Sequence, residues 1–164
     1  MQKAELQKKR WQSTPERNDD RINRLKTPQE CEIFSKNVTE RGFPELAARA
    51  RRRAVQLQAA SHDVHSEAER DGLQAVYAYE QTLSAVRRKR TRATGAWRII
   101  KSRGIIEAIR SLANRQAGEI DYANLRETGM QDLAFESIVV KHAAAFDAET
   151  VRRCEDRLAA WTRV

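Results

Sequence analysis

Apolar residues recur along most of this chain at the three- and four-residue spacing that is typical of amphipathic helices. Thr27 can cap a helix that begins at Pro28, and Glu30 stands three residues after the cap, as in a capping box. Gly42 ends this helix, and Pro44 begins the next one. The short connection between the two predicts an antiparallel helical hairpin.

This hairpin, residues 28–59, resembles a single tetratricopeptide unit. The small and apolar positions of that motif are matched by Gly42, Ala47, Ala54 and Leu57, and the packing positions of its first helix by Cys31, Phe34 and Val38. No second copy follows in the sequence, whereas arrays of such units need about three repeats to be stable. The resemblance therefore implies the geometry of a hairpin and assigns no functional residue.

A second capping box, Ser66 with Glu69, predicts a long helix that reaches about Val86. Its apolar residues lie on two sides, so we expect it to pack centrally in the bundle. The residues on those sides are Leu73, Val76, Tyr77 and Leu83, and Ala75, Tyr79, Thr82 and Val86.

Shorter helices are predicted after the long one. Thr94 can cap a helix that ends at Gly104, and another begins at once with Ile105. Asp121 can cap a single turn that ends at Gly129. The segment 131–142 is apolar nearly all round and predicts one buried helix, and Asp147 caps a last helix.

These elements predict an all-α fold, a compact multi-helix bundle with an N-terminal αα-hairpin. Residues 1–26 are polar, with Trp11 as the single aromatic residue, and predict a tail that is helical at most near residues 16–26. Residues 27–164 are expected to form a single helical-bundle domain.

Composition supports the helical fold. The 164 residues include only six Gly and three Pro, too few for the many turns of a sandwich or barrel.

Cys31 and Cys154 stand far apart among apolar residues, which indicates buried thiols and a reducing compartment. No apolar run is long enough to span a bilayer, and the N-terminus lacks the apolar core of a secretory signal. We therefore expect a cytoplasmic protein that does not bind membranes.

Positive charge is concentrated in one part of the chain. Residues 87–115 hold ten Lys or Arg against one acid, a local charge of +9, whereas the whole chain carries +8. Such an excess is too one-sided for a salt-bridged surface and indicates a partner that is a polyanion.

Within this segment, residues 87–103 are the predicted contact. Arginine forks can hold phosphates in a bidentate manner, and an indole beside them can stack on bases. We expect a non-catalytic protein that binds DNA or RNA chiefly through phosphates. The predicted nucleic-acid-binding residues are Arg87, Arg88, Lys89, Arg90, Arg92, Trp97, Arg98, Lys101 and Arg103. The alternative is a protein–protein interaction module, an adaptor or inhibitor of a nucleic-acid enzyme, that docks an acidic partner through the same residues.

Other patterns are better explained by structure. A helix-turn-helix over 94–112 would bury Arg103 and Arg110, so it is disfavoured. The arginines at 49 and 51–53 point in different directions on a helix and predict a solvated surface. Glu80, on the apolar side of the long helix, predicts a carboxylate paired with an arginine or a tyrosine hydroxyl.

Catalytic chemistry is not indicated. His62 and His65 flank Asp63, but they lack further ligands at a metal-binding spacing, so we expect no metal and no other cofactor. The chain has no glycine-rich phosphate loop and no nucleophile with a nearby base. No catalytic residue is assigned.

Overall fold

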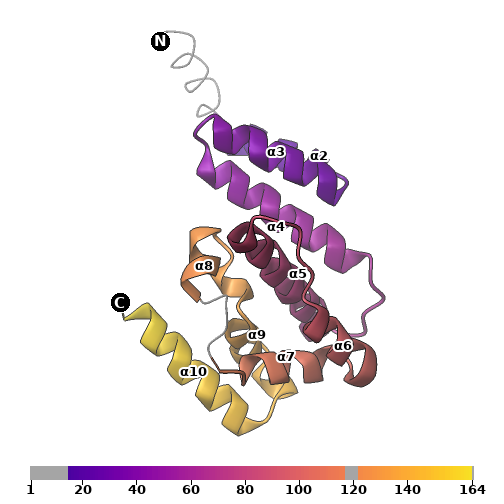
Figure 1. Ribbon diagram of the computed structural model, residues 1–164, viewed down its shortest axis with the longest axis vertical. Coiled ribbons are helices and arrows are strands. Elements are labelled where there is room, and N and C mark those ends of the chain that lie inside the picture. Colours follow the sequence, from indigo (N-terminus) through magenta and orange to yellow (C-terminus); the bar gives the residue numbers. More distant parts are fainter. Residues whose placement is uncertain (1–14, 117–121, 164) are drawn as a thin grey trace. The chain divides into compact units, whose positions relative to one another are not determined.

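A computed structural model describes residues 15–116 and 122–163, and it describes side chains from Asp20 onward (Figure 1). Trp11 and the predicted cap Asp121 lie outside these residues. Over the described ranges the chain is all-α, without a strand, as the sequence predicts. No helix in these ranges is long and apolar enough to cross a membrane. The chain divides into two compact units, one ending at Leu57 and the other beginning at Gln58.

The N-terminal unit contains helices α2 (Pro15–Arg24) and α3 (Pro28–Glu40) and all but the last three residues of α4 (Pro44–Ala60). The predicted cap is confirmed, because the Thr27 hydroxyl accepts the Glu30 N–H at 3.2 Å. The Glu30 carboxylate accepts the N–H of Lys26, one residue before the position that a capping box uses. Gly42 ends α3 with a positive φ of 83°, a conformation that glycine adopts readily.

Helices α3 and α4 form the predicted hairpin. Val38, Leu46 and Ala47 make a buried cluster, with Phe34 and Phe43 packed against it. Because apolar side chains from both helices are removed from water here, this cluster stabilises the turn at residues 41–43.

Two of the four arginines of α4, Arg51 and Arg53, differ from the prediction of a solvated surface, whereas Arg49 is exposed. Arg51 donates to the Ser35 hydroxyl at 3.3 Å, and Arg53 donates to the Leu25 carbonyl at 3.3 Å. Burial lowers the pKa of the Arg51 guanidinium. These long side chains tie α4 to α3 and to the end of α2, so they are part of the packing of this unit.

The C-terminal unit is built around α5 (Glu67–Arg87), which packs on helices from later in the chain (Figure 1). The central position predicted for this helix is confirmed. The elements that follow it are α6 (Thr94–Arg103), α7 (Ile105–Ala113), α8 (Tyr122–Glu127), η1 (Gln131–Leu133), α9 (Phe135–Lys141), η2 (Ala143–Ala145) and α10 (Ala148–Thr162). The prediction of one domain over residues 27–164 stays a prediction, since each unit is described by itself.

Helices α5 and α7 approach closely at Gly72. A Cβ at this position would lie 3.0 Å from side-chain atoms of both Ile105 and Ile109. Gly72 is buried within α5, where glycine costs about 1 kcal/mol of helix propensity relative to alanine. The close contact with the two isoleucines is a packing reason for glycine here.

Two buried ionic groups join the remaining helices. Glu136 on α9 is only 4% exposed and lies 3.5 Å from Arg157 and 3.9 Å from Arg115. Asp71 on α5 lies 2.8 Å from both Lys141 and His142. Burial opposes ionisation of Asp71, but the hydrogen bonds from Lys141 and His142 outweigh it and lower the pKa of the carboxyl.

Three expectations for this unit are corrected. Thr94 does not cap α6, because it is already the first helical residue and Ala93 occupies the cap position. The segment 131–142 is not one helix, since extended backbone at Ala134 separates η1 from α9. Val86 does not face the core and is 45% exposed, because it stands in the last turn of α5.

Candidate nucleic-acid interface

The predicted contact residues lie on the C-terminal unit, from the last turn of α5 through α6. We call this set the basic edge: Arg87, Arg88, Lys89, Arg90, Arg92, Trp97, Arg98, Lys101 and Arg103. All eight cations in it are exposed, and Trp97 is half-buried. Exposed cations within one short stretch produce a positive local field, which is the electrostatic requirement for binding phosphates.

The backbone changes direction at Arg88, where α5 ends. Arg88 lies in the left-handed region, with a φ of 55°, and it is the one residue other than glycine with positive φ among the described residues. Its N–H bonds to the Ala85 carbonyl at 3.4 Å, and the Lys89 N–H bonds to the Ser84 carbonyl at 3.2 Å. This pair of bonds is the Schellman motif, in which glycine is the usual left-handed residue.

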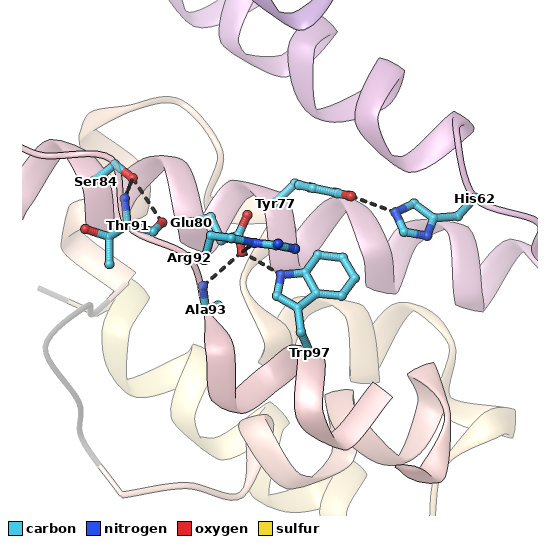
Figure 2. Close-up of polar contacts among 8 residues, drawn as sticks. All are labelled: His62, Tyr77, Glu80, Ser84, Thr91, Arg92, Ala93 and Trp97. Atoms are coloured by element: carbon cyan, nitrogen blue, oxygen red, sulfur yellow. Dashed lines mark hydrogen bonds and ion pairs between the residues drawn. The ribbon is translucent and has the colours of Figure 1, made fainter. Parts of the chain in front are cut away.

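The segment after this turn is held against α5 by Ser84. The Ser84 hydroxyl accepts the Thr91 N–H at 2.9 Å and lies 3.2 Å from the Thr91 carbonyl, to which it donates (Figure 2). The Thr91 hydroxyl in turn donates to the Lys89 carbonyl at 2.9 Å. Fixed hydrogen bonds therefore close a loop that carries Lys89 and Arg90 on its outside.

Glu80, one helical turn before Ser84, holds the next part of the same segment. One oxygen of its carboxylate accepts the Ala93 N–H at 2.9 Å and the indole N–H of Trp97 at 2.5 Å (Figure 2). The same oxygen lies 3.9 Å from Nε of Arg92. The sequence predicted an arginine or a tyrosine as its partner; Arg92 is a partner, and the two N–H groups are additional ones.

Aromatic rings surround the indole of Trp97. The His62 ring stacks on it at 5.6 Å with 12° between the planes, and the Tyr77 ring is tilted against it at 5.2 Å. Nε2 of His62 lies 2.6 Å from the Tyr77 hydroxyl (Figure 2). Burial, together with the nearby charge of Glu80, raises the pKa of Tyr77.

Arg92 completes this cluster. Its guanidinium carbon lies 5.7 Å from the centre of the Trp97 ring, within the range of a cation–π contact. Its side chain is 73% exposed, so the guanidinium still faces solvent. The indole N–H of Trp97 is bonded to Glu80, and its ring already carries the His62 ring and the Arg92 guanidinium.

Two cations of the segment 87–115 lie outside the basic edge, Arg110 and Arg115, and both contact other side chains of the bundle. Arg110 donates to both carboxylate oxygens of Glu107, and this contact lowers the pKa of Glu107. Arg115 lies over the Phe135 ring at 5.0 Å and near the buried Glu136. Arg110 thus forms an ion pair within α7, where its side chain stays 42% exposed, whereas Arg115 belongs to the packing of the bundle.

The residues that fix the basic edge were only partly visible in the sequence. Glu80 was identified as a structural carboxylate, whereas Ser84 and His62 carried no signal of this role. A serine one turn after a buried acid, on a helix that leads into a basic loop, is the pattern that could have found Ser84. This pattern becomes informative only once the fold is known, because serine is common near helix ends.

Metal ligation is not seen in this region. His62 bonds to Tyr77, and the N–H of His65 bonds to the Glu69 carboxylate at 2.9 Å as part of the cap of α5. Within residues 15–116 and 122–163, no three His, Cys, Asp or Glu side chains are placed to hold a metal ion.

No protein-family model matches the chain, and neither a curated protein nor a solved structure shows significant similarity to it. The class of the protein is thus given by its fold, an all-α chain with a helical bundle, and any function has to be inferred from the basic edge.

Proposed function

We propose that the chain is a non-catalytic, cytoplasmic nucleic-acid-binding protein that contacts phosphates of DNA or RNA through the basic edge. The observation that carries this proposal is the combination of exposed cations with a backbone fixed to α5. Seven of the predicted residues lie within Arg87–Arg98, and the bonds from Ser84 and Glu80 hold Thr91 and Ala93 in the middle of this range.

A fixed backbone favours phosphate binding because it lowers the ordering cost of the cations. Each long cationic side chain that is immobilised on binding costs about 0.5–1.5 kcal/mol, and a mobile loop would add the cost of its backbone. Arginine predominates in this segment, and its planar fork suits bidentate contact with phosphate oxygens.

The proposal is tested by binding of labelled duplex DNA, single-stranded DNA and structured RNA across a salt series. If about five phosphates are neutralised, log K should fall with log salt with a slope of about −4.5 on duplex DNA. A flat response would refute binding through phosphates.

A charge-matched pair of variants separates the basic edge from the overall charge. The first replaces Arg87, Arg88, Lys89 and Arg90 with Gln, and it should bind weakly with a shallower salt slope. The control replaces four exposed cations outside the edge, Lys36, Arg41, Arg152 and Arg163, and has the same net charge. Equal losses in both variants would mean that binding follows net charge rather than this site.

The second candidate is a module that docks an acidic protein. It is supported by Val86, which is 45% exposed beside Arg87, because an apolar side chain next to cations suits a protein surface better than a phosphate backbone. Nucleic acid that co-purifies and is released by high salt, seen as a raised 260/280 nm absorbance ratio, favours the first candidate. Capture of a defined acidic protein by nucleic-acid-free material favours the second.

A further inference from the structure

Glu80 stands in an unexpected place for a polyanion-binding surface. By charge alone, a carboxylate beside the basic edge repels phosphates, so its removal should strengthen binding. Yet this side chain is only 13% exposed, and one of its oxygens accepts the Ala93 N–H and the Trp97 indole N–H and lies 3.9 Å from Nε of Arg92.

These three partners lie close together in the chain, within residues 92–97. Ala93 is the cap residue of α6 and has no side-chain cap of its own, so the Glu80 carboxylate stands at the positive end of that helix. Trp97 lies one turn further along α6, and Arg92 directly precedes the cap. A single carboxylate therefore joins the α5 helix to the start of α6 and draws Arg92 over the indole ring (Figure 2).

We propose that Glu80 is a positioning residue of the polyanion site, an acid whose presence strengthens the binding of phosphates. This inference rests on the proposed function. The contacts of Glu80 fix where Arg92 and the first turn of α6 lie, and the adjacent cations compensate its own charge. Without Glu80, Arg92 and α6 would have to be ordered by the ligand, and that cost would appear as lost affinity.

The test compares Glu80→Gln and Glu80→Ala with the unchanged chain, using fluorescence anisotropy of a labelled duplex DNA at one fixed salt concentration. Gln keeps the shape and one acceptor oxygen but loses the charge that attracts Arg92. We expect affinity to fall by about three- to tenfold for Gln, and further for Ala. Circular dichroism and urea unfolding identify any loss that comes from unfolding.

The matched control is Glu107→Gln. Glu107 lies near Arg103 of the same edge, but it bonds to Arg110 and does not contact the segment 91–97. Its substitution should leave affinity unchanged or raise it, because a negative charge near the edge is lost and the ion pair lost with it, to Arg110, lies outside the segment 91–97. Opposite signs for Glu80→Gln and Glu107→Gln would distinguish positioning from electrostatics.

A double-mutant cycle adds a measurement that general destabilisation would not alter. Arg92→Gln should weaken binding strongly when Glu80 is present and much less in the Glu80→Gln background. If folded Glu80 variants bind as tightly as the unchanged chain, or more tightly, the positioning role is refuted while phosphate binding stands. If the unchanged chain itself shows no salt-dependent binding, the proposed function fails, and the inference fails with it.

Discussion

Ser84 and Thr91 are joined by two hydrogen bonds, one in each direction between the serine hydroxyl and the threonine backbone. Thr91 lies outside any helix, so its backbone N–H and carbonyl need other partners, and a single side chain on α5 bonds to both. Four cations, at positions 87–90, lie within the loop that these bonds close. This hydroxyl group is therefore one of the contacts that hold the loop between α5 and α6.

Replacement of Ser84 with Ala should loosen this loop. Both bonds are lost, so local opening of residues 87–92 costs less free energy, and trypsin, which cuts after Lys and Arg, should cleave there several-fold faster. The measurement is limited proteolysis followed by mass spectrometry of the fragments. The matched control is Ser102→Ala, because the Ser102 hydroxyl bonds only to carbonyls of its own helix. Unchanged cleavage in the Ser84 variant would show that the loop is held by other contacts.

Two substitutions of Arg88 should differ in their effect on stability but not in their effect on binding. A left-handed residue with a side chain costs about 1 kcal/mol more than glycine, so Arg88→Gly should be more stable to urea than Arg88→Ala by about that amount. Both variants lack the same cation, and both should bind polyanions more weakly than the unchanged chain if the proposed function holds. Equal stabilities would contradict the left-handed conformation at this position.

Substitution of Gly72 with Leu should destabilise the C-terminal unit by about 1–3 kcal/mol. The added side chain meets Ile105 and Ile109, and α5 and α7 must separate to accept it. Urea unfolding followed by circular dichroism measures the change. Gly95→Leu is the control, since a Cβ at Gly95 meets nothing within 4 Å, and it should be neutral or stabilising. A Gly72 variant as stable as the control would refute the tight contact.

Asp71 should make stability depend on pH. Its carboxyl has a lowered pKa in the folded chain, so its contribution is present above the unfolded value of about 3.9 and is lost as pH falls through the folded pKa. Asp71→Asn should cost about 1–3 kcal/mol at neutral pH and should flatten the acid side of the stability profile.

Urea unfolding at several pH values below 6 measures this effect. The control is Asp156→Asn on α10, an exposed position at which we expect little change. If the stability of the Asp71 variant falls with pH as much as that of the unchanged chain, the pH dependence comes from other carboxyl groups.

Helix starts and stops were predictable because their signals are local. The Thr27, Ser66 and Asp147 side chains each accept the N–H three residues later, as their spacing indicates. Gly42 and Gly104 end helices with positive φ for the same reason. The start of α6 was missed by one residue, because Ala93, whose N–H bonds to the Glu80 carboxylate of α5, occupies the cap position in place of Thr94.

The charge pattern was readable in part. The sequence shows where cations are concentrated, but it does not show which of them are engaged in packing. Arg110 and Arg115 belong to the same basic segment as Arg90, yet they contact Glu107 and Glu136. Glu136 is separated from Arg115 by a stretch of chain that no local periodicity can bridge.

By itself, the sequence determined the all-α class, the bounds of the main helices and the segment in which cations are concentrated, because each of these depends on residues within one or two helical turns. Only the tertiary structure decided what holds the basic edge in place. Ser84 meets Thr91 seven residues later, and Glu80 meets Ala93 and Trp97 thirteen and seventeen residues later. Such contacts require the chain to turn back on α5, and the geometry of that turn is set by packing of the whole C-terminal unit.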